Sequence, residues 1–82
     1  MNSSIESVKE FLRKNGLTET EQDIFTNEKV KVEINMDMYY YVVSFDGGTM
    51  YSDGLNIYWL IGVLTYYNLI ERDYKSLNDN NG

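Results

Sequence analysis

The sequence predicts a small α+β domain in which an N-terminal and a C-terminal helix pack on one face of a four-stranded antiparallel meander, in the order α-β-β-β-β-α. Three observations predict this class. Apolar residues recur at helical spacing near the N-terminus, alternate with polar residues in the middle of the chain, and return to helical spacing after residue 54. Each change of period indicates a change of element, and the two helical stripes need a sheet face to cover them.

The N-terminal segment is predicted to form an amphipathic helix that begins at Ser3 and ends before Gly16. Ser3 followed by Glu6 matches a capping box, in which each side chain bonds a free backbone amide of the first turn. Asn15-Gly16 can supply the left-handed conformation that ends a helix, and Leu17 can fold back on the last turn as in a Schellman motif. The apolar stripe of this helix consists of Ile5, Val8, Phe11 and Leu12.

Four strands are predicted at residues 21–26, 29–34, 39–45 and 49–52. The second has the clearest pattern, because charged residues alternate with Val30, Val32 and Ile34 as in a strand with one buried face. Turn residues separate the strands, and the strongest hairpin signal is Asp46-Gly47-Gly48, where glycine allows a positive φ. The first strand has the weakest pattern.

A second helix is predicted at residues 56–67, with Asp53 or Asn56 as its N-cap and Asn68 as its C-terminal cap. Gly62 lies inside it at an expected cost of ~1 kcal/mol relative to alanine, so we expect a close approach there to the sheet or to another chain. The expected core stripe is Ile57, Leu60, Ile61 and Leu64, and Leu69-Ile70 return to the core.

This second helix is apolar on nearly all sides, which is more apolar surface than one small sheet can cover. Either the rest of the chain covers it, or it forms a partner surface, with self-association the simplest case. Tyrosine and tryptophan are favoured anchors in interfaces. The residues off the main stripe, and therefore the candidates for partner binding, are Tyr58, Trp59, Val63, Tyr66 and Tyr67.

The strand at 39–45 carries further candidates. If Tyr39, Tyr41, Val43 and Phe45 face the helices, Tyr40 and Val42 lie on the open face of the sheet and become partner-binding candidates. Aromatic residues on a central strand can also stack on bases, as in RNA-recognition domains. The acidity of this part of the chain argues against that use.

Composition excludes several functions. The 82 residues include neither cysteine nor histidine and carry a net charge of −6, which removes thiol and imidazole catalysis and disfavours phosphate backbones and anionic lipids. We therefore expect no enzymatic activity, no cofactor, no metal site, no direct nucleic-acid binding and no membrane segment, in a cytoplasmic protein. Residues 19–53 hold eight acidic and two basic residues, so the sheet is either a solvated acidic surface or an imitation of nucleic acid.

Residues 1–75 are expected to form one domain, and residues 76–82 a disordered polar tail. The order of a short Val8-Lys9-Glu10-Phe11-Leu12 helix, a meander, and Met50-Tyr51-Ser52 leading into the run from Leu55 to Tyr67 resembles small uncharacterised bacteriophage-encoded proteins. That resemblance carries over no residue role, but it implies a protein that binds and redirects a host complex.

The leading interpretation is a non-enzymatic interaction module, homo-oligomeric and acting on a protein partner. The alternatives are a nucleic-acid mimic that occupies the basic groove of a host nuclease, polymerase or defence complex, and a structural or virion-associated protein.

Overall fold

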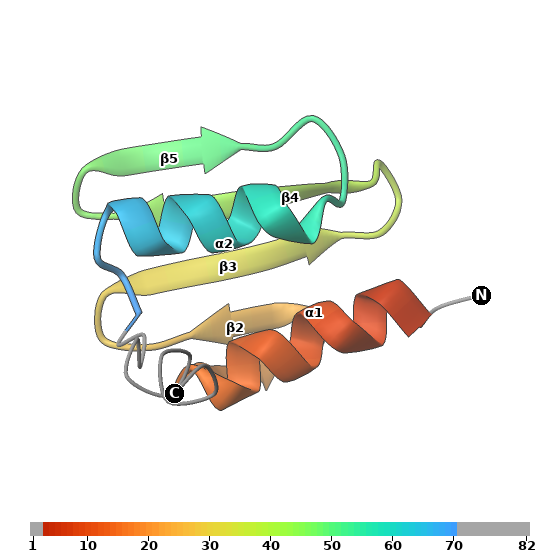
Figure 1. Ribbon diagram of the computed structural model, residues 1–82, viewed down its shortest axis with the longest axis horizontal. Helices are drawn as coiled ribbons and strands as arrows, with labels where there is room; N and C mark the ends of the chain where they lie inside the picture. The colour runs from red at the N-terminus through yellow and green to blue at the C-terminus, as the bar shows by residue number, and fades with distance from the viewer. Residues whose placement is uncertain (1–2, 71–82) are drawn as a thin grey trace, which may run out of the picture.

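The computed structural model describes residues 3–70 and shows an α+β fold with two helices on one face of an antiparallel sheet (Figure 1). The strands follow one another in space in their sequence order, β1-β2-β3-β4-β5, so the sheet is a simple meander. Helix α1 lies over the β1–β2 side and helix α2 over the β3–β5 side. The elements are α1 (Ser3–Lys14), β1 (Thr18–Glu21), β2 (Ile24–Thr26), β3 (Val30–Asn35), β4 (Tyr40–Phe45), β5 (Gly48–Tyr51) and α2 (Ile57–Tyr66).

The sheet has five strands, and the prediction of four is wrong at its first strand. The segment predicted as one strand at 21–26 contains the last residue of β1, a turn at Gln22 and Asp23, and β2, and residues 18–20 of β1 lie before it. Strands β1 and β2 pair antiparallel as a hairpin. Asp23 takes the left-handed conformation with φ 64°, and its backbone N–H donates to Glu19 Oε2 at 3.0 Å. Strand β1 has the sequence Thr-Glu-Thr-Glu, which lacks the apolar alternation that indicates a strand.

Both helices end in the same Schellman motif. After α1, Gly16 adopts φ 91°, and Leu17 N–H donates to the Leu12 carbonyl at 3.0 Å, which confirms the predicted ending. After α2, Asn68 adopts φ 59°, and Leu69 N–H donates to the Leu64 carbonyl at 2.8 Å. Asn68 therefore has the capping role that the sequence predicts.

The N-cap contact is described for α2 but not for α1. Asn56 is the N-cap of α2, since its Oδ1 accepts from Tyr58 N–H at 2.8 Å, which selects Asn56 over Asp53. Helix α1 begins at Ser3, but the capping contact predicted for the Ser3 side chain lies outside the described part of the chain. The same holds for the predicted tail at 76–82 and for residues 71–75 of the predicted domain.

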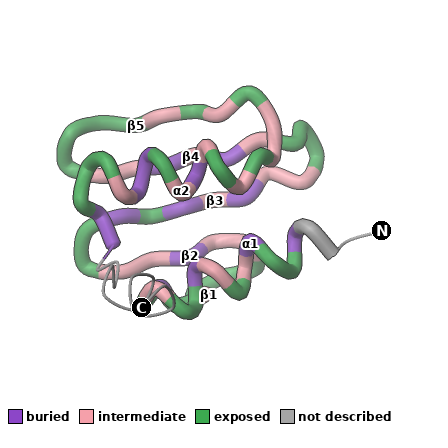
Figure 2. Tube along the Cα trace, viewed as in Figure 1, coloured by how far each residue is buried: buried purple, intermediate pink, exposed green. Residues whose placement is uncertain are grey.

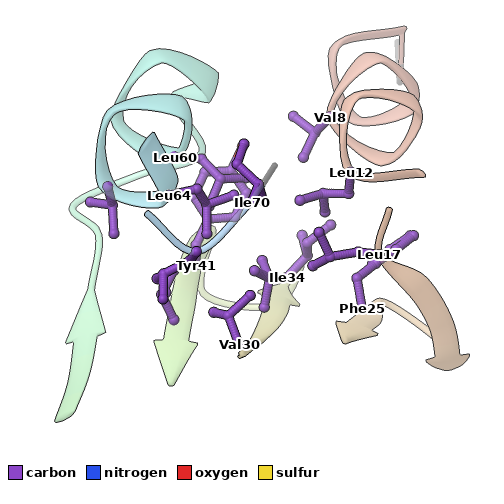
Figure 3. Close-up of a cluster of buried hydrophobic side chains, with 14 of the residues drawn as sticks. Val8, Leu12, Leu17, Phe25, Val30, Ile34, Tyr41, Leu60, Leu64 and Ile70 are labelled. Carbon is purple, nitrogen blue, oxygen red and sulfur yellow. The ribbon is translucent and has the colours of Figure 1, made fainter. Parts of the chain in front are cut away.

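One core lies between the helix layer and the sheet (Figures 2 and 3). Register places Phe25, Val32, Val43 and Met50 side by side across four strands, so these residues share the face that the helices cover. Figure 3 shows side chains from α1, α2 and the sheet converging on the same layer. The buried residues are Ile5, Val8, Leu12, Leu17, Phe25, Val30, Val32, Ile34, Tyr41, Val43, Leu60, Val63, Leu64, Leu69 and Ile70.

The core stripe of α2 differs from the predicted one. Val63, predicted to lie off the stripe, is buried with 9% of its surface exposed, whereas Ile61 is only half-buried. Leu60, Val63 and Leu64 form the buried side because the helix is rotated so that residue 63 rather than residue 61 points at the sheet. Gly62 does not approach the sheet, since a Cβ atom added there would meet nothing within 4 Å.

The start of β4 is also later than predicted. Tyr39 belongs to the β3–β4 turn with φ 61°, and it is exposed rather than facing the helices. Asn35 organises this turn, because its side-chain oxygen accepts from Met38 N–H and its carbonyl from Tyr39 N–H. Tyr41, Val43 and the half-buried Phe45 face the core as the sequence predicts.

Candidate interaction surface

Helix α2 presents an exposed aromatic strip on the side opposite the core. Tyr58 and Tyr66 lie two turns apart with 79% and 80% of their surfaces exposed, and Gly62 lies midway between them with open space above it. We call Tyr58, Gly62 and Tyr66 the α2 ridge. The helix carries no charged residue from Ile57 to Tyr66. Its outer side therefore lacks the charged side chains that normally face solvent on a surface helix.

Tyr67 extends the ridge at its C-terminal end. Its ring contacts Tyr66 edge to face at a centroid distance of 4.8 Å and Phe45 of β4 at 4.9 Å. These separations are typical of favourable aromatic pairs. Tyr67 is therefore anchored against the sheet while still 43% exposed, and it supports the position of Tyr66.

Trp59 is a packing residue on the flank of α2. It is half-buried, and its ring stacks on that of Tyr41 at a centroid distance of 6.2 Å with an interplanar angle of 16°. Tyr41 is fully buried, and its hydroxyl has no hydrogen-bond partner among the described residues. Burial raises the pKa of Tyr41 to about 12 because the charged phenolate is poorly solvated there.

The two candidate residues of β4 lie on the opposite side of the molecule. Tyr40 and Val42 are on the uncovered face of the sheet, as predicted, and both are half-buried. Val42 lies opposite Tyr51 of β5, and the rings of Tyr40 and Tyr51 are 6.2 Å apart. The sheet separates these residues from the α2 ridge, so the seven predicted partner-binding residues do not form one surface.

Helix α1 carries charged side chains on the flank that faces the β1–β2 hairpin. Lys9 Nζ lies 2.8 Å from Asp23 Oδ1 and 3.9 Å from Glu19 Oε2, while Arg13 Nη2 lies 3.3 Å from Glu19 Oε1. The bond to Asp23 is the main cause that raises the pKa of Lys9, and the Asp23 N–H lowers the pKa of Glu19. The guanidinium carbon of Arg13 also lies 5.6 Å from the centre of the Phe25 ring, within the range of a cation–π contact.

Sequence reasoning missed three exposed apolar side chains outside the helices. Met38 and Tyr39 lie at the tip of the β3–β4 turn, and Tyr51 lies on the edge strand β5. Tyr39 is predicted as the first residue of the strand at 39–45, where it would face the helices, whereas Met38 lies outside every predicted element. The signal for Tyr51 was available, since the alternation from Met50 places residue 51 on the uncovered face.

Neither a metal site nor a membrane helix is found within residues 3–70. These residues contain no group of three acidic side chains that could bind a metal ion, and neither helix has the length and hydropathy that crossing a membrane requires. Comparisons with models of known protein families, with curated proteins and with solved structures find no match.

Proposed function

We propose that this protein is a non-enzymatic interaction module that self-associates through the α2 ridge. The observation that carries the proposal is the pair of tyrosines at 79% and 80% exposure on a helix without charges. An exposed aromatic strip of this kind is costly in water and is typical of an interface. Binding to a host complex, as the resemblance to phage-encoded proteins implies, would use the same kind of surface.

The spacing of the ridge suits a two-fold symmetric contact. Tyr58 and Tyr66 are each four residues from Gly62, so a two-fold axis through Gly62 would bring Tyr58 of one copy against Tyr66 of the other. A glycine at the crossing point lets two helices approach closely, and this explains a residue that is unfavourable in a helix and has no packing role inside its own chain.

Charge also favours contact between two copies at this helix. Each copy has a net charge of −6, so two copies repel least where their facing surfaces carry no charge. The nucleic-acid mimic finds less support, because Glu19 and Asp23 are paired with Lys9 and Arg13 of the same chain. These two carboxylates are not free to meet a basic groove.

Sedimentation of the purified protein tests the proposal, with a dimer expected at micromolar concentration. Tyr66→Ser should weaken the dimer at least tenfold, which corresponds to ~1.4 kcal/mol, whereas Tyr39→Ser removes an exposed tyrosine elsewhere and should leave it unchanged. A monomer at high micromolar concentration would contradict the proposal, and so would equal weakening by both substitutions.

Substitution of Gly62 separates association from folding. Gly62→Leu should abolish the dimer by blocking the close approach, while the isolated fold stays intact because a side chain there meets open space. Gly62→Ala should increase the free energy of unfolding of the monomer by ~1 kcal/mol. A dimer that persists in Gly62→Leu would rule out the crossing at Gly62.

A further inference from the structure

Strand β5 forms an unpaired edge of the sheet. It is the last strand in the order β1-β2-β3-β4-β5, and Figure 1 shows no described segment beyond it. Ser52 N–H donates to the Tyr41 carbonyl, and antiparallel pairs alternate between bonded and non-bonded positions. The pairs Tyr41–Ser52 and Val43–Met50 are therefore bonded, and the pairs that contain Tyr51 and Thr49 are not. The backbone groups of Thr49 and Tyr51 consequently point away from β4.

The two edges of the sheet are protected to different degrees. Strand β1 has a register irregularity between Glu19 and Glu21 and carries charged side chains, both of which oppose pairing with a further strand. Strand β5 keeps an unbroken register with β4 and contains neither a charge nor a proline. The outer edge of β5 is therefore competent to accept another strand.

Charge at the two ends of β5 discriminates between possible occupants. Asp46 lies two residues before β5 and Asp53 two residues after it, and both are exposed. If β5 paired antiparallel with β5 of a second copy, with the outward-facing Thr49 opposite Tyr51, Asp46 of each copy would lie opposite Gly54 of the other, next to Asp53. Like charges brought this close across a strand pair destabilise it, so a second copy is disfavoured here.

We propose that the β5 edge binds an extended peptide segment of a partner protein, with a basic residue near each end and apolar β-branched residues between them. The free backbone groups of Thr49 and Tyr51 supply the hydrogen bonds, and Asp46 and Asp53 attract the basic ends. Tyr51 and Thr49 point to the uncovered face, where alternate side chains of the added strand would pack beside the Tyr40–Tyr51 ring pair.

The probe is an acetylated and amidated peptide with alternating threonine and valine between two terminal lysines. About eight residues are needed to reach from Asp46 to Asp53. Two N-methylated versions carry methyl groups on alternate sets of amides. Because only one set of amides in a strand faces β5, one version should lose binding and the other should retain it. Equal behaviour of the two versions, or no saturable binding of the unmethylated peptide, would overturn the proposal.

Substitutions in the protein test the charge contribution. Asp46→Asn combined with Asp53→Asn should weaken peptide binding about tenfold at low salt. The matched control is Glu21→Gln, which removes an exposed acidic side chain on β1, at the opposite edge of the sheet, and should change affinity less than twofold. A similar loss in this control would show non-specific attraction to an acidic protein and would contradict the proposal.

The proposed strand site does not depend on self-association through the α2 ridge. Tyr66→Ser disrupts the ridge but leaves the β5 edge intact, so this variant should bind the peptide with unchanged affinity. Loss of peptide binding in the Tyr66→Ser variant would contradict an independent β5 site, whereas a dimer that fails to form would leave the site standing.

Discussion

The two helices of this protein end and pack in the same way but differ on their outer sides. Each ends in a Schellman motif, and each places a fully buried leucine, Leu12 or Leu64, beneath its last turn. The flank of α1 carries Lys9 and Arg13, which pair with the β1–β2 hairpin, and its outer side carries exposed charges at Glu6, Glu10 and Lys14. The outer side of α2 carries exposed tyrosines and no charge. The buried leucines of both helices therefore stabilise the fold, whereas only the outer side of α2 offers an uncharged aromatic surface to a partner.

An amphipathic pattern depends on the residues of both sides of a helix. In α1 the polar residues mark the solvent side, so the buried side follows directly from the sequence. In α2 the residues on all sides are apolar, and periodicity does not determine its rotation on the sheet. That is why Val63 was assigned to the outside and Ile61 to the core, with the structure showing a different rotation.

The largest expected effects test whether the two helices are anchored equally. Leu12→Ala and Leu64→Ala each empty a fully buried site under a helix end, so each should lower the free energy of unfolding by ~3 kcal/mol. Chemical denaturation of a monomeric background such as Gly62→Leu measures both. A difference larger than ~1.5 kcal/mol between the two would show that one helix contributes much less to stability than the other.

Much of the fold could be predicted because local chemistry determined it. Gly16 and Leu17 end α1, the alternation around Val32 defines β3, and Asp46-Gly47 forms a hairpin turn. The β1–β2 hairpin was missed because its pairing depends on tertiary contacts: the turn at Asp23 is held by Glu19 and by Lys9 from α1. Neither contact leaves a periodic signal in the sequence.

The candidate surface was predicted less well than the fold. Tyr58 and Tyr66 are exposed, as their positions off the stripe indicated, but Tyr40 and Val42 lie on the other side of the sheet. Sequence spacing gives the face of a single element, whereas a surface combines faces of several elements. The open edge at β5 depends on which strand is last in the sheet, and that is a property of topology.

The next effect compares the aromatic residues beneath the two helices. Phe25 lies below α1 and Tyr41 below α2, and both are fully buried (Figure 3). Only Tyr41 carries a hydroxyl, which has no partner among the described residues. Tyr41→Phe should therefore increase the free energy of unfolding by ~1 kcal/mol, because an unsatisfied polar group is removed. Unchanged or lower stability would show that the hydroxyl is satisfied in solution.

The same substitution removes a dependence on alkaline pH. The pKa of Tyr41 is about 12 in the folded protein and near its ordinary value of 10.0 when unfolded. Between these values the unfolded chain loses the proton while the folded protein keeps it, so stability falls as pH rises above 10. In Tyr41→Phe this part of the decline should disappear from thermal unfolding curves, with Tyr39→Phe as the exposed control.

A smaller effect compares the residues that end the two helices. Gly16 and Asn68 both have positive φ, but glycine adopts that conformation without strain and asparagine does so at some cost. Gly16→Ala should lower the free energy of unfolding by ~1 kcal/mol, and Asn68→Gly should raise it by a few tenths. Denaturation midpoints measure both changes. If Asn68→Gly lowers stability, the Asn68 side chain contributes to the α2 ending beyond its backbone conformation.

The smallest effect tests the charged flank of α1 that faces the β1–β2 hairpin. Lys9→Met removes the contacts with Asp23 and Glu19, and pairs near the surface are worth about 0–1 kcal/mol, less at high salt. The pKa of Lys9 is raised above 10.5, so its contribution is present below that pH and is lost as pH rises through the folded value. The lowered pKa of Glu19 gives a contribution that is present above 4.5 and is lost as pH falls.

The unfolding temperature of Lys9→Met should therefore fall below that of the parent chain at neutral pH and low salt, and the gap should close in concentrated salt and at acid pH. Lys14→Met provides the control, since it removes an exposed lysine of α1 outside the ion pairs with the hairpin. Equal effects of the two substitutions would mean that the lysines of α1 contribute through general charge rather than through contact with the β1–β2 hairpin. Helix α2 carries no charge on its outer side. In that case the two helices would differ in net charge, but both would be held to the sheet by apolar packing alone.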